Sequence, residues 1–234
     1  MNSIKNILKI AHHGYTPICK SRQNTLFAFK NAVEHNFDMI ELDVQLCKSD
    51  EIVIHHDTHI PYNGKLTPII DITLNNLQLS NPYLITLQDF FNNIDISKKM
   101  KLYIDIKGNT NIIIKSLIDL LYNNYSTFKN IIVGSFNRKH LEEIERHNKD
   151  LSIDNEYYIN QAFITENIFE MKQLENILEN KEYLIIHWTM LDEETVQYCK
   201  ERNIKVFCYT AKSSNIVDYM KKYDIDGIVS DILL

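Results

Sequence analysis

Short apolar runs alternate with amphipathic stretches along most of this chain. Eight of the runs are rich in β-branched and aromatic residues and predict strands. They cover residues 6–12, 39–46, 101–106, 130–135, 151–158, 183–188, 205–209 and 227–230. Between them, apolar residues recur every three or four positions, which predicts helices. These helices cover residues 25–35, 111–122, 138–147, 167–178, 192–202 and 215–223.

Strands that alternate with helices predict a parallel sheet whose faces are covered. With eight strands, the expected closure is a (β/α)8 TIM barrel formed by residues 1–234 as a single domain. Two interruptions are expected: a hairpin over residues 39–56 and an irregular loop over residues 57–82, where three of the four prolines lie. Only four residues follow Ser230, so the last outer helix should be missing.

Composition says more about the possible binding partners of the protein than about its fold. The net charge of −6 and the pI of about 5.8 argue against a nucleic-acid-binding protein, which normally carries a basic stripe. No apolar run approaches the ~18 residues of a membrane helix, and the N-terminus lacks the features of a signal peptide. We therefore expect a cytoplasmic protein without a transmembrane segment. Its cysteines should be reduced; they are Cys19, Cys47, Cys199 and Cys208. Nothing in the sequence predicts the oligomeric state.

Ionisable residues gather where the predicted strands end. In a barrel these ends meet at one face, where active sites are built. The residues are His12 and His13, Glu41 and Asp43, His55 and His56, and Asp105 with Lys107. Each of these residues, taken alone, could be an ordinary surface residue or part of an ion pair at the edge of the barrel. Four strand ends with this chemistry make accidental convergence a poor explanation, and three carboxylates suit Mg²⁺ or Ca²⁺.

The motifs A-H-H-G, N-T-L-x-A-F-x-x-A, I-E-L-D-V-Q-L and I-V-I-H-H-D-T resemble the glycerophosphodiester phosphodiesterase family, a group of metal-dependent (β/α) barrels. The resemblance is dense over residues 11–58 and continues more thinly over nearly the whole chain. It implies hydrolysis of a glycerophosphodiester to an alcohol and glycerol phosphate. His12 and His56 match the catalytic histidines of the family, and Glu41 and Asp43 match two of its metal ligands.

The resemblance extends to further positions, several of which depart from the family pattern. Asp105 stands where the family has a third metal-ligating acid, Glu, and Lys107 matches a phosphate-binding lysine. Tyr209 replaces a pocket-lining Trp, and His13 replaces an arginine that contacts the phosphate. Because Pro-Glu is also replaced by Arg22-Gln23, we hypothesise that Arg22 supplies part of the missing positive charge at the phosphate.

Two histidines suit acid and base roles near neutral pH, and the residues leave open which is which. The substrate is expected to be a small-molecule phosphodiester. Two alternatives remain. One is a lipid-directed phospholipase D, similar to sphingomyelinase D, whose apolar entrance would come from Ile60, Tyr62, Leu66, Ile69 and Ile70. The other is a barrel that binds phosphodiesters but has lost turnover, as the changes at His13, Gln23 and Asp105 would allow.

The remaining histidines have less specific readings. We interpret His55, His59, His140 and His147 as exposed or helix-surface residues. His187 and Trp188 are adjacent on one predicted strand, so only one of them can face the barrel interior.

Overall fold

The computed structural model describes residues 6–17, 22–96 and 100–234. Eight parallel strands form a closed barrel, because β1 pairs with both β11 and β2. The strands are β1 (Leu8–Ala11), β2 (Met39–Leu46), β6 (Lys101–Ile106), β7 (Ile131–Ser135), β8 (Asn160–Thr165), β9 (Tyr183–His187), β10 (Lys205–Ala211) and β11 (Gly227–Ser230). The predicted TIM barrel is therefore confirmed.

Apolar side chains fill both faces of these strands, as a covered parallel sheet requires. One cluster lies inside the barrel and includes Ile10, Tyr103 and Phe207. Gly134 faces the same interior, where a Cβ atom would come within 2.8 Å of the Tyr103 ring. A larger cluster joins the outer face of the strands to the surrounding helices.

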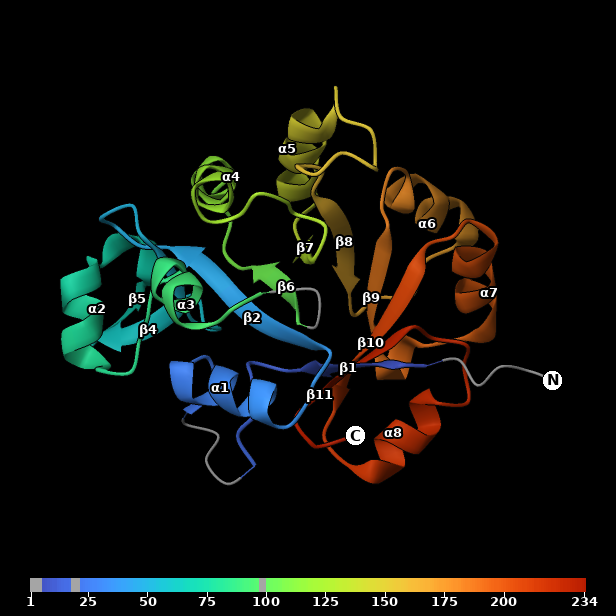
Figure 1. Ribbon diagram of the computed structural model, residues 1–234, viewed down its shortest axis with the longest axis horizontal. Helices are drawn as coiled ribbons and strands as arrows, with labels where there is room; N and C mark the ends of the chain where they lie inside the picture. Colours follow the sequence, from blue (N-terminus) through green and yellow to red (C-terminus); the bar gives the residue numbers. More distant parts are fainter. Residues whose placement is uncertain (1–5, 18–21, 97–99) are drawn as a thin grey trace.

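Those helices are α1 (Leu26–Glu34), α4 (Ile112–Asn124), α5 (Arg138–Asn148), α6 (Met171–Leu178), α7 (Glu193–Glu201) and α8 (Ser214–Met220). They lie around the strands in Figure 1 and match the predicted helices, with the start of α6 four residues later than expected. Side-chain caps fix several starts: the hydroxyl of Thr25 accepts the Ala28 N–H, and the Asp192 carboxylate accepts the Thr195 N–H. In the described part of the chain no helix follows β11.

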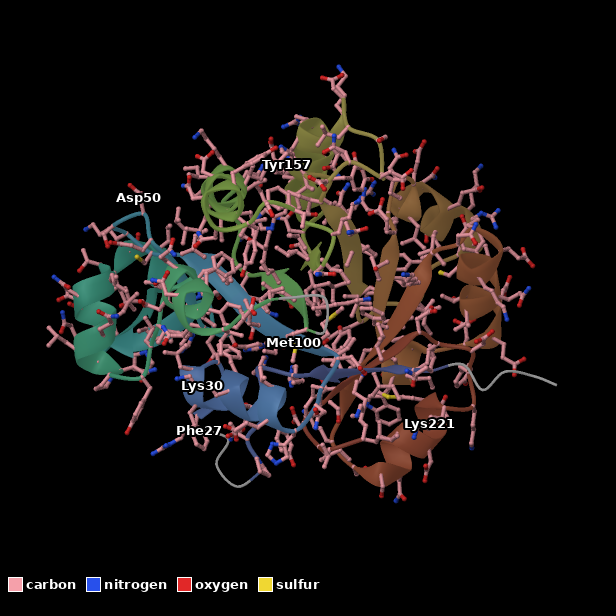
Figure 2. The ribbon with its side chains drawn as sticks, viewed as in Figure 1. Phe27, Lys30, Asp50, Met100, Tyr157 and Lys221 are labelled. Atoms are coloured by element: carbon pink, nitrogen blue, oxygen red, sulfur yellow. The ribbon has the colours of Figure 1, made fainter. Side chains whose placement is uncertain are left out.

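The segment between β2 and β6 forms an insertion that projects to one side of the barrel (Figure 1). β3 (Ile52–Ile54) pairs antiparallel with β2, which confirms the hairpin. Asp50 lies at the exposed outer edge of the connecting turn (Figure 2).

The prediction of an irregular loop over residues 57–82 is wrong. This stretch contains β4 (His59–Tyr62), β5 (Lys65–Pro68), a 3-10 turn (Ile69–Asp71) and α2 (Leu74–Ser80), and α3 (Leu87–Asn93) follows it. Asn63 and Gly64 both have positive φ, 49° and 74°, which is the two-residue turn that favours a hairpin. A small core that includes Cys47, Val53 and Leu77 holds the insertion together.

The strand predicted at residues 151–158 is also misplaced. That stretch consists of turns, and Ile153 in it is 60% exposed. The strand lies in the next segment, where β8 pairs with β7 and β9. β8 begins with two polar residues, Asn160 and Gln161, so the hydrophobic pattern alone did not identify it as a buried strand.

Other expectations concern cysteines, histidines and membranes. Cys47, Cys199 and Cys208 are free and buried, while Cys19 lies outside the described residues. The surface prediction for His140 is wrong, because its side chain is fully buried and lies 3.0 Å from the Ser135 hydroxyl. Within the described ranges, no helix is long and apolar enough to span a bilayer.

Candidate active site

Neighbouring strands bring the predicted carboxylates together at the mouth of the barrel. β2 and β6 pair in register, so that Asp43 lies beside Asp105 and Glu41 beside Tyr103. Residues two apart on a strand share a face, which puts Glu41 and Asp43 on the side of Asp105. All three carboxylates are buried, with residue exposures of 3%, 0% and 5% for Glu41, Asp43 and Asp105.

These three residues, named here the acid triad, can present oxygens within 4.8 Å of one another. Burial and the nearby Asp43 raise the pKa of Glu41 to about 8, and burial raises that of Asp105 to about 6 despite Lys107. Asp105 Oδ1 is buried and has no hydrogen-bond partner among the described residues. Crowded carboxylates with an unused buried oxygen fit a divalent cation, which would favour their ionised forms.

Lys107 follows β6 and completes the charged cluster. Its Nζ lies 3.0 Å from Asp43 Oδ1 and 2.6 Å from Asp105 Oδ2. Burial alone would lower the pKa of Lys107, but Asp105 and Asp43 raise it above its usual range. The ammonium therefore stays protonated and lines the cavity at the mouth of the barrel.

The turn after β1 ties His12 and His13 to the acid triad. The backbone N–H of His13 donates to Glu41 Oε2 at 2.7 Å, and its ring Nε2 lies 2.8 Å from Asp43 Oδ2. His13 has a φ of 54°, and Gly14 packs so closely on Ala28 that a Cβ atom would come within 2.7 Å. Burial would lower the pKa of His13, but Asp43 and Glu41 raise it to about 9, so the ring is a cation at neutral pH.

His12 lines the cavity and has a carboxylate partner near the end of the chain. Its Nδ1 lies 2.6 Å from Asp231 Oδ1, with side-chain exposures of 19% and 11%. Burial and the adjacent His13 lower the pKa of His12 to about 4, although Asp231 raises it. The ring is therefore neutral near pH 7. If Nδ1–H donates to Asp231, the other nitrogen, Nε2, has a free lone pair.

His56 comes from the insertion rather than from a barrel strand. It follows β3, its side chain is 56% exposed, and its Nδ1 lies 2.8 Å from Asp57 Oδ1. The ring of His13 lies between the other two, 3.7 Å from His12 and 5.4 Å from His56 between centroids. His56 lines both the central cavity and a second cavity beside the insertion.

The central cavity has a volume of about 250 Å³. Its walls include both proposed catalytic histidines, the acid triad and Lys107. Other lining residues come from the ends of later strands: Phe136, Glu166, His187, Tyr209 and Lys212.

A family comparison agrees with this geometry. Residues 11–233 match the model of the glycerophosphoryl diester phosphodiesterase family. The chain belongs to that family. It is accordingly an enzyme, a glycerophosphodiester phosphodiesterase.

Relatives of this phosphodiesterase are named for different activities. A glycerophosphodiester phosphodiesterase of Caldanaerobacter subterraneus subsp. tengcongensis is 27% identical over 245 aligned positions, covering 96% of this chain and 93% of that protein. A human lysophospholipase D is 27% identical over 163 positions, covering 62% of this chain and 50% of that protein. The solved structure of an Oleispira antarctica phosphodiesterase, in complex with the product sn-glycerol-3-phosphate, has the same fold, with a TM-score of 0.79 at 20% identity over 97% of this chain and 93% of that one.

Two of the residues expected to bind substrate in this phosphodiesterase lie elsewhere. The guanidinium of Arg22 lies 5.2 Å from the Phe27 ring centroid and 5.4 Å from that of Tyr83, and Arg22 does not line the central cavity. His13 faces Asp43 and the second cavity. Tyr209 does line the central cavity. Trp188 instead packs against Tyr219.

Sequence reasoning missed several residues of the site. Asn24, with a φ of 57°, donates from Nδ2 to Asp43 Oδ2 at 2.7 Å. Asp231 holds His12. Asn24 lies in one of the motifs that carry the resemblance, but both contacts depend on tertiary structure. Glu166 follows β8, the strand that was misplaced, so its position at a strand end could not be recognised.

Proposed function

We propose that this enzyme hydrolyses a glycerophosphodiester to an alcohol and glycerol phosphate, with a divalent metal ion and two histidines as acid and base. The observation that carries the proposal is the convergence of His12, His56, Lys107 and the acid triad on one cavity. The product named in the Oleispira structure, sn-glycerol-3-phosphate, supports the same reaction.

The acid triad would hold the metal ion. Its hard carboxylate oxygens suit Mg²⁺ or Ca²⁺, and the unpartnered Oδ1 of Asp105 is an available ligand atom. When bound, the ion would supply Lewis acidity to the phosphoryl oxygens.

Lys107 would bind the phosphate. Its ammonium lines the cavity beside Asp43 and Asp105, so it can donate hydrogen bonds to a non-bridging phosphoryl oxygen. A permanent positive charge there stabilises the extra negative charge that develops as the nucleophile attacks phosphorus.

His12 would act as the base and His56 as the acid. The low pKa of His12 keeps it neutral, and Asp231 holds its Nδ1, so Nε2 can accept a proton from a water molecule as the water oxygen bonds to phosphorus. His56, in its protonated form, would give a proton to the alcohol oxygen as the other P–O bond breaks. One water is consumed. Its oxygen forms the new bond to phosphorus and one of its protons goes to His12, while the alcohol leaves with the proton from His56.

The test is hydrolysis of a panel of glycerophosphodiesters with Mg²⁺ or Ca²⁺, with EDTA controls. We expect activity that EDTA abolishes, and each of His12→Ala and His56→Ala should lower kcat by about 10²–10⁴-fold. His147→Ala, which removes a half-buried histidine on α5 outside the lining of the central cavity, serves as a control. Wild-type turnover in both active-site variants, with the metal bound, would contradict the assignment.

A lipid substrate is the second candidate. A groove of about 530 Å³ includes Leu46, Pro68 and Ile70 in its lining and shares Lys107 with the central cavity. A single acyl chain could lie there while the phosphate binds at Lys107, and one relative is named a lysophospholipase D. Of the predicted apolar entrance, Leu66 is 71% exposed, but Ile69 is fully buried. Faster hydrolysis of lysophosphatidylcholine than of glycerophosphocholine would support this candidate.

A further inference from the structure

Gln45 lies on β2 in the same row as two carboxylates of the site. Residues two apart on a strand face the same side, so Gln45 continues the row of Glu41 and Asp43 toward the mouth of the barrel. The residue is buried, with an exposed fraction of 4%. Gln45 does not line the central cavity, so any effect of this residue on the reaction passes through a neighbour.

The side-chain amide of Gln45 binds the segment that carries His56, named here segment 55–57. Its Nε2 donates to the His55 carbonyl at 2.7 Å and to the Asp57 carbonyl at 3.0 Å. These carbonyls belong to the residues on either side of His56. Because both acceptors are carbonyl oxygens, the nitrogen end of the amide faces them and uses both of its N–H groups. Gln45 thus fixes segment 55–57 to a barrel strand at two points.

The ring of His56 depends on this attachment. Its side chain is 56% exposed, and the carboxylate of Asp57 that contacts its Nδ1 is 71% exposed. Asp57 belongs to the same segment, so this contact orients the ring within the segment but does not fix the segment to the barrel. A proton donor has to lie within about 2.6–3.2 Å of the oxygen that it protonates, and a small displacement of the segment is enough to exceed this distance.

Two other contacts limit the expected effect. The His55 N–H donates to the Asp43 carbonyl at 3.0 Å, which is a further bond from segment 55–57 to β2. His55 Nδ1 lies 3.1 Å from the Asp57 carbonyl, so that carbonyl keeps a partner when Gln45 is changed. Loss of the amide should therefore displace the segment rather than unfold the barrel. The loss of rate should be smaller than that caused by removing His56 itself.

We propose that Gln45 is a positioning residue for His56. Its amide holds segment 55–57 so that the imidazole can give its proton to the leaving alcohol. The inference rests on the proposed function, in which His56 is the acid. Because Gln45 itself transfers no proton, its replacement should lower kcat and leave KM and metal affinity close to those of the wild type.

The experiment compares Gln45→Met with His56→Ala on two diesters of glycerol phosphate, one with glycerol and one with 4-nitrophenol as the leaving group. Met keeps the length of the side chain but cannot donate to either carbonyl. With the glycerol diester, Gln45→Met should lower kcat about 10- to 30-fold, as expected for two hydrogen bonds. With the nitrophenyl diester both variants should lose much less, because nitrophenolate leaves without a proton. Neither substrate has an acyl chain, so the groove that Gln45 lines does not affect the comparison.

Further variants separate positioning from a general loss of structure. Gln45→Met combined with His56→Ala should be no slower than His56→Ala alone, because the effect of Gln45 passes through His56. Gln197→Met, which changes an exposed glutamine on α7, should match the wild type on both diesters. If Gln45→Met does not fold, Gln45→Asn, whose amide is one methylene short of the two carbonyls, gives the same comparison.

Three results overturn the inference and leave the proposed function intact. They are an unchanged kcat in Gln45→Met, a dependence on the leaving group that differs from that of His56→Ala, and a further loss in the combined variant. Equal losses on the two diesters by His56→Ala, or no loss, would contradict the acid role in the proposed function instead. Hydrogen exchange then decides the contact separately: faster exchange of the His55 amide in Gln45→Met, with β6 unchanged, supports it, and equal exchange overturns it.

Discussion

Replacing Asp231 by asparagine tests whether His12 depends on its carboxylate partner. The 2.6 Å contact joins two side chains that are 19% and 11% exposed, so solvent compensates little for its loss. Hydrogen bonds to charged groups contribute about 1.5–3 kcal/mol. If this energy is expressed in the transition state, where His12 becomes positive, its loss corresponds to about 10- to 150-fold in kcat.

Asparagine keeps an oxygen that can accept from Nδ1–H, whereas alanine keeps nothing. We therefore expect Asp231→Asn near the lower limit of that range and Asp231→Ala near the upper one. The assay is steady-state hydrolysis of a glycerophosphodiester at saturating metal, with metal affinity measured separately by calorimetry. KM and metal affinity should change little, because Asp231 is not part of the acid triad.

The pH profile provides a second readout for Asp231. Activity falls as the base is protonated, so the acid limb follows the pKa of His12. Asp231 raises that pKa, and its neutralisation should move the limb to lower pH. Asp218→Asn removes an exposed charge on α8 and should not shift the limb. The role of Asp231 is refuted if Asp231→Ala keeps kcat within threefold of the wild type and the limb in place.

Three other predictions concern metal and stability. Asp105→Asn should weaken divalent-metal binding in calorimetry and lessen the rise in Tm that the metal causes. It should not lower the metal-free Tm, because burial opposes ionisation of this carboxyl. Unchanged metal affinity would exclude Asp105 as a ligand. His140→Gln should make the free energy of unfolding less sensitive to acid. Burial lowers the pKa of His140, so the unfolded chain binds the proton more readily, and the stability of the wild type falls as pH drops through about 6.5. Urea unfolding at pH 7 and below pH 6 measures this difference. Gly134→Ala should cost about 1–3 kcal/mol in the same unfolding assay, since its Cβ would come within 2.8 Å of the Tyr103 ring; an unchanged midpoint would mean that the barrel interior has room to adjust.

The barrel could be predicted because hydrophobic periodicity reports local burial. β9 is apolar up to His187, and β2 is apolar apart from Glu41, Asp43 and Gln45. β8 was misplaced because Asn160 and Gln161 are polar, and only its pairing with two neighbours makes it a strand. The β4–β5 hairpin was missed because the prolines outweighed Asn63-Gly64, although Pro61 and Pro68 are compatible with a two-stranded sheet.

The site was predicted in part for a similar reason. The acid triad and Lys107 lie on adjacent strands at a spacing of two, a pattern visible in sequence. The contact between His12 and Asp231 joins residues 219 positions apart and is formed only when β1 and β11 close the barrel. Arg22 was judged by its charge alone, whereas its position depends on contacts with Phe27 and Tyr83.

The insertion is attached to the barrel in a way that should let it open as a unit separate from the barrel strands. β3 pairs with the end of β2 through three residue pairs, and the His55 N–H donates to the Asp43 carbonyl. Hydrogen exchange should therefore detect opening of the insertion at a lower free energy than that of the barrel strands. Each such opening withdraws His56 while the carboxylates on β2 and β6 stay in place. The population of the closed insertion, rather than global stability, then sets the fraction of molecules able to turn over.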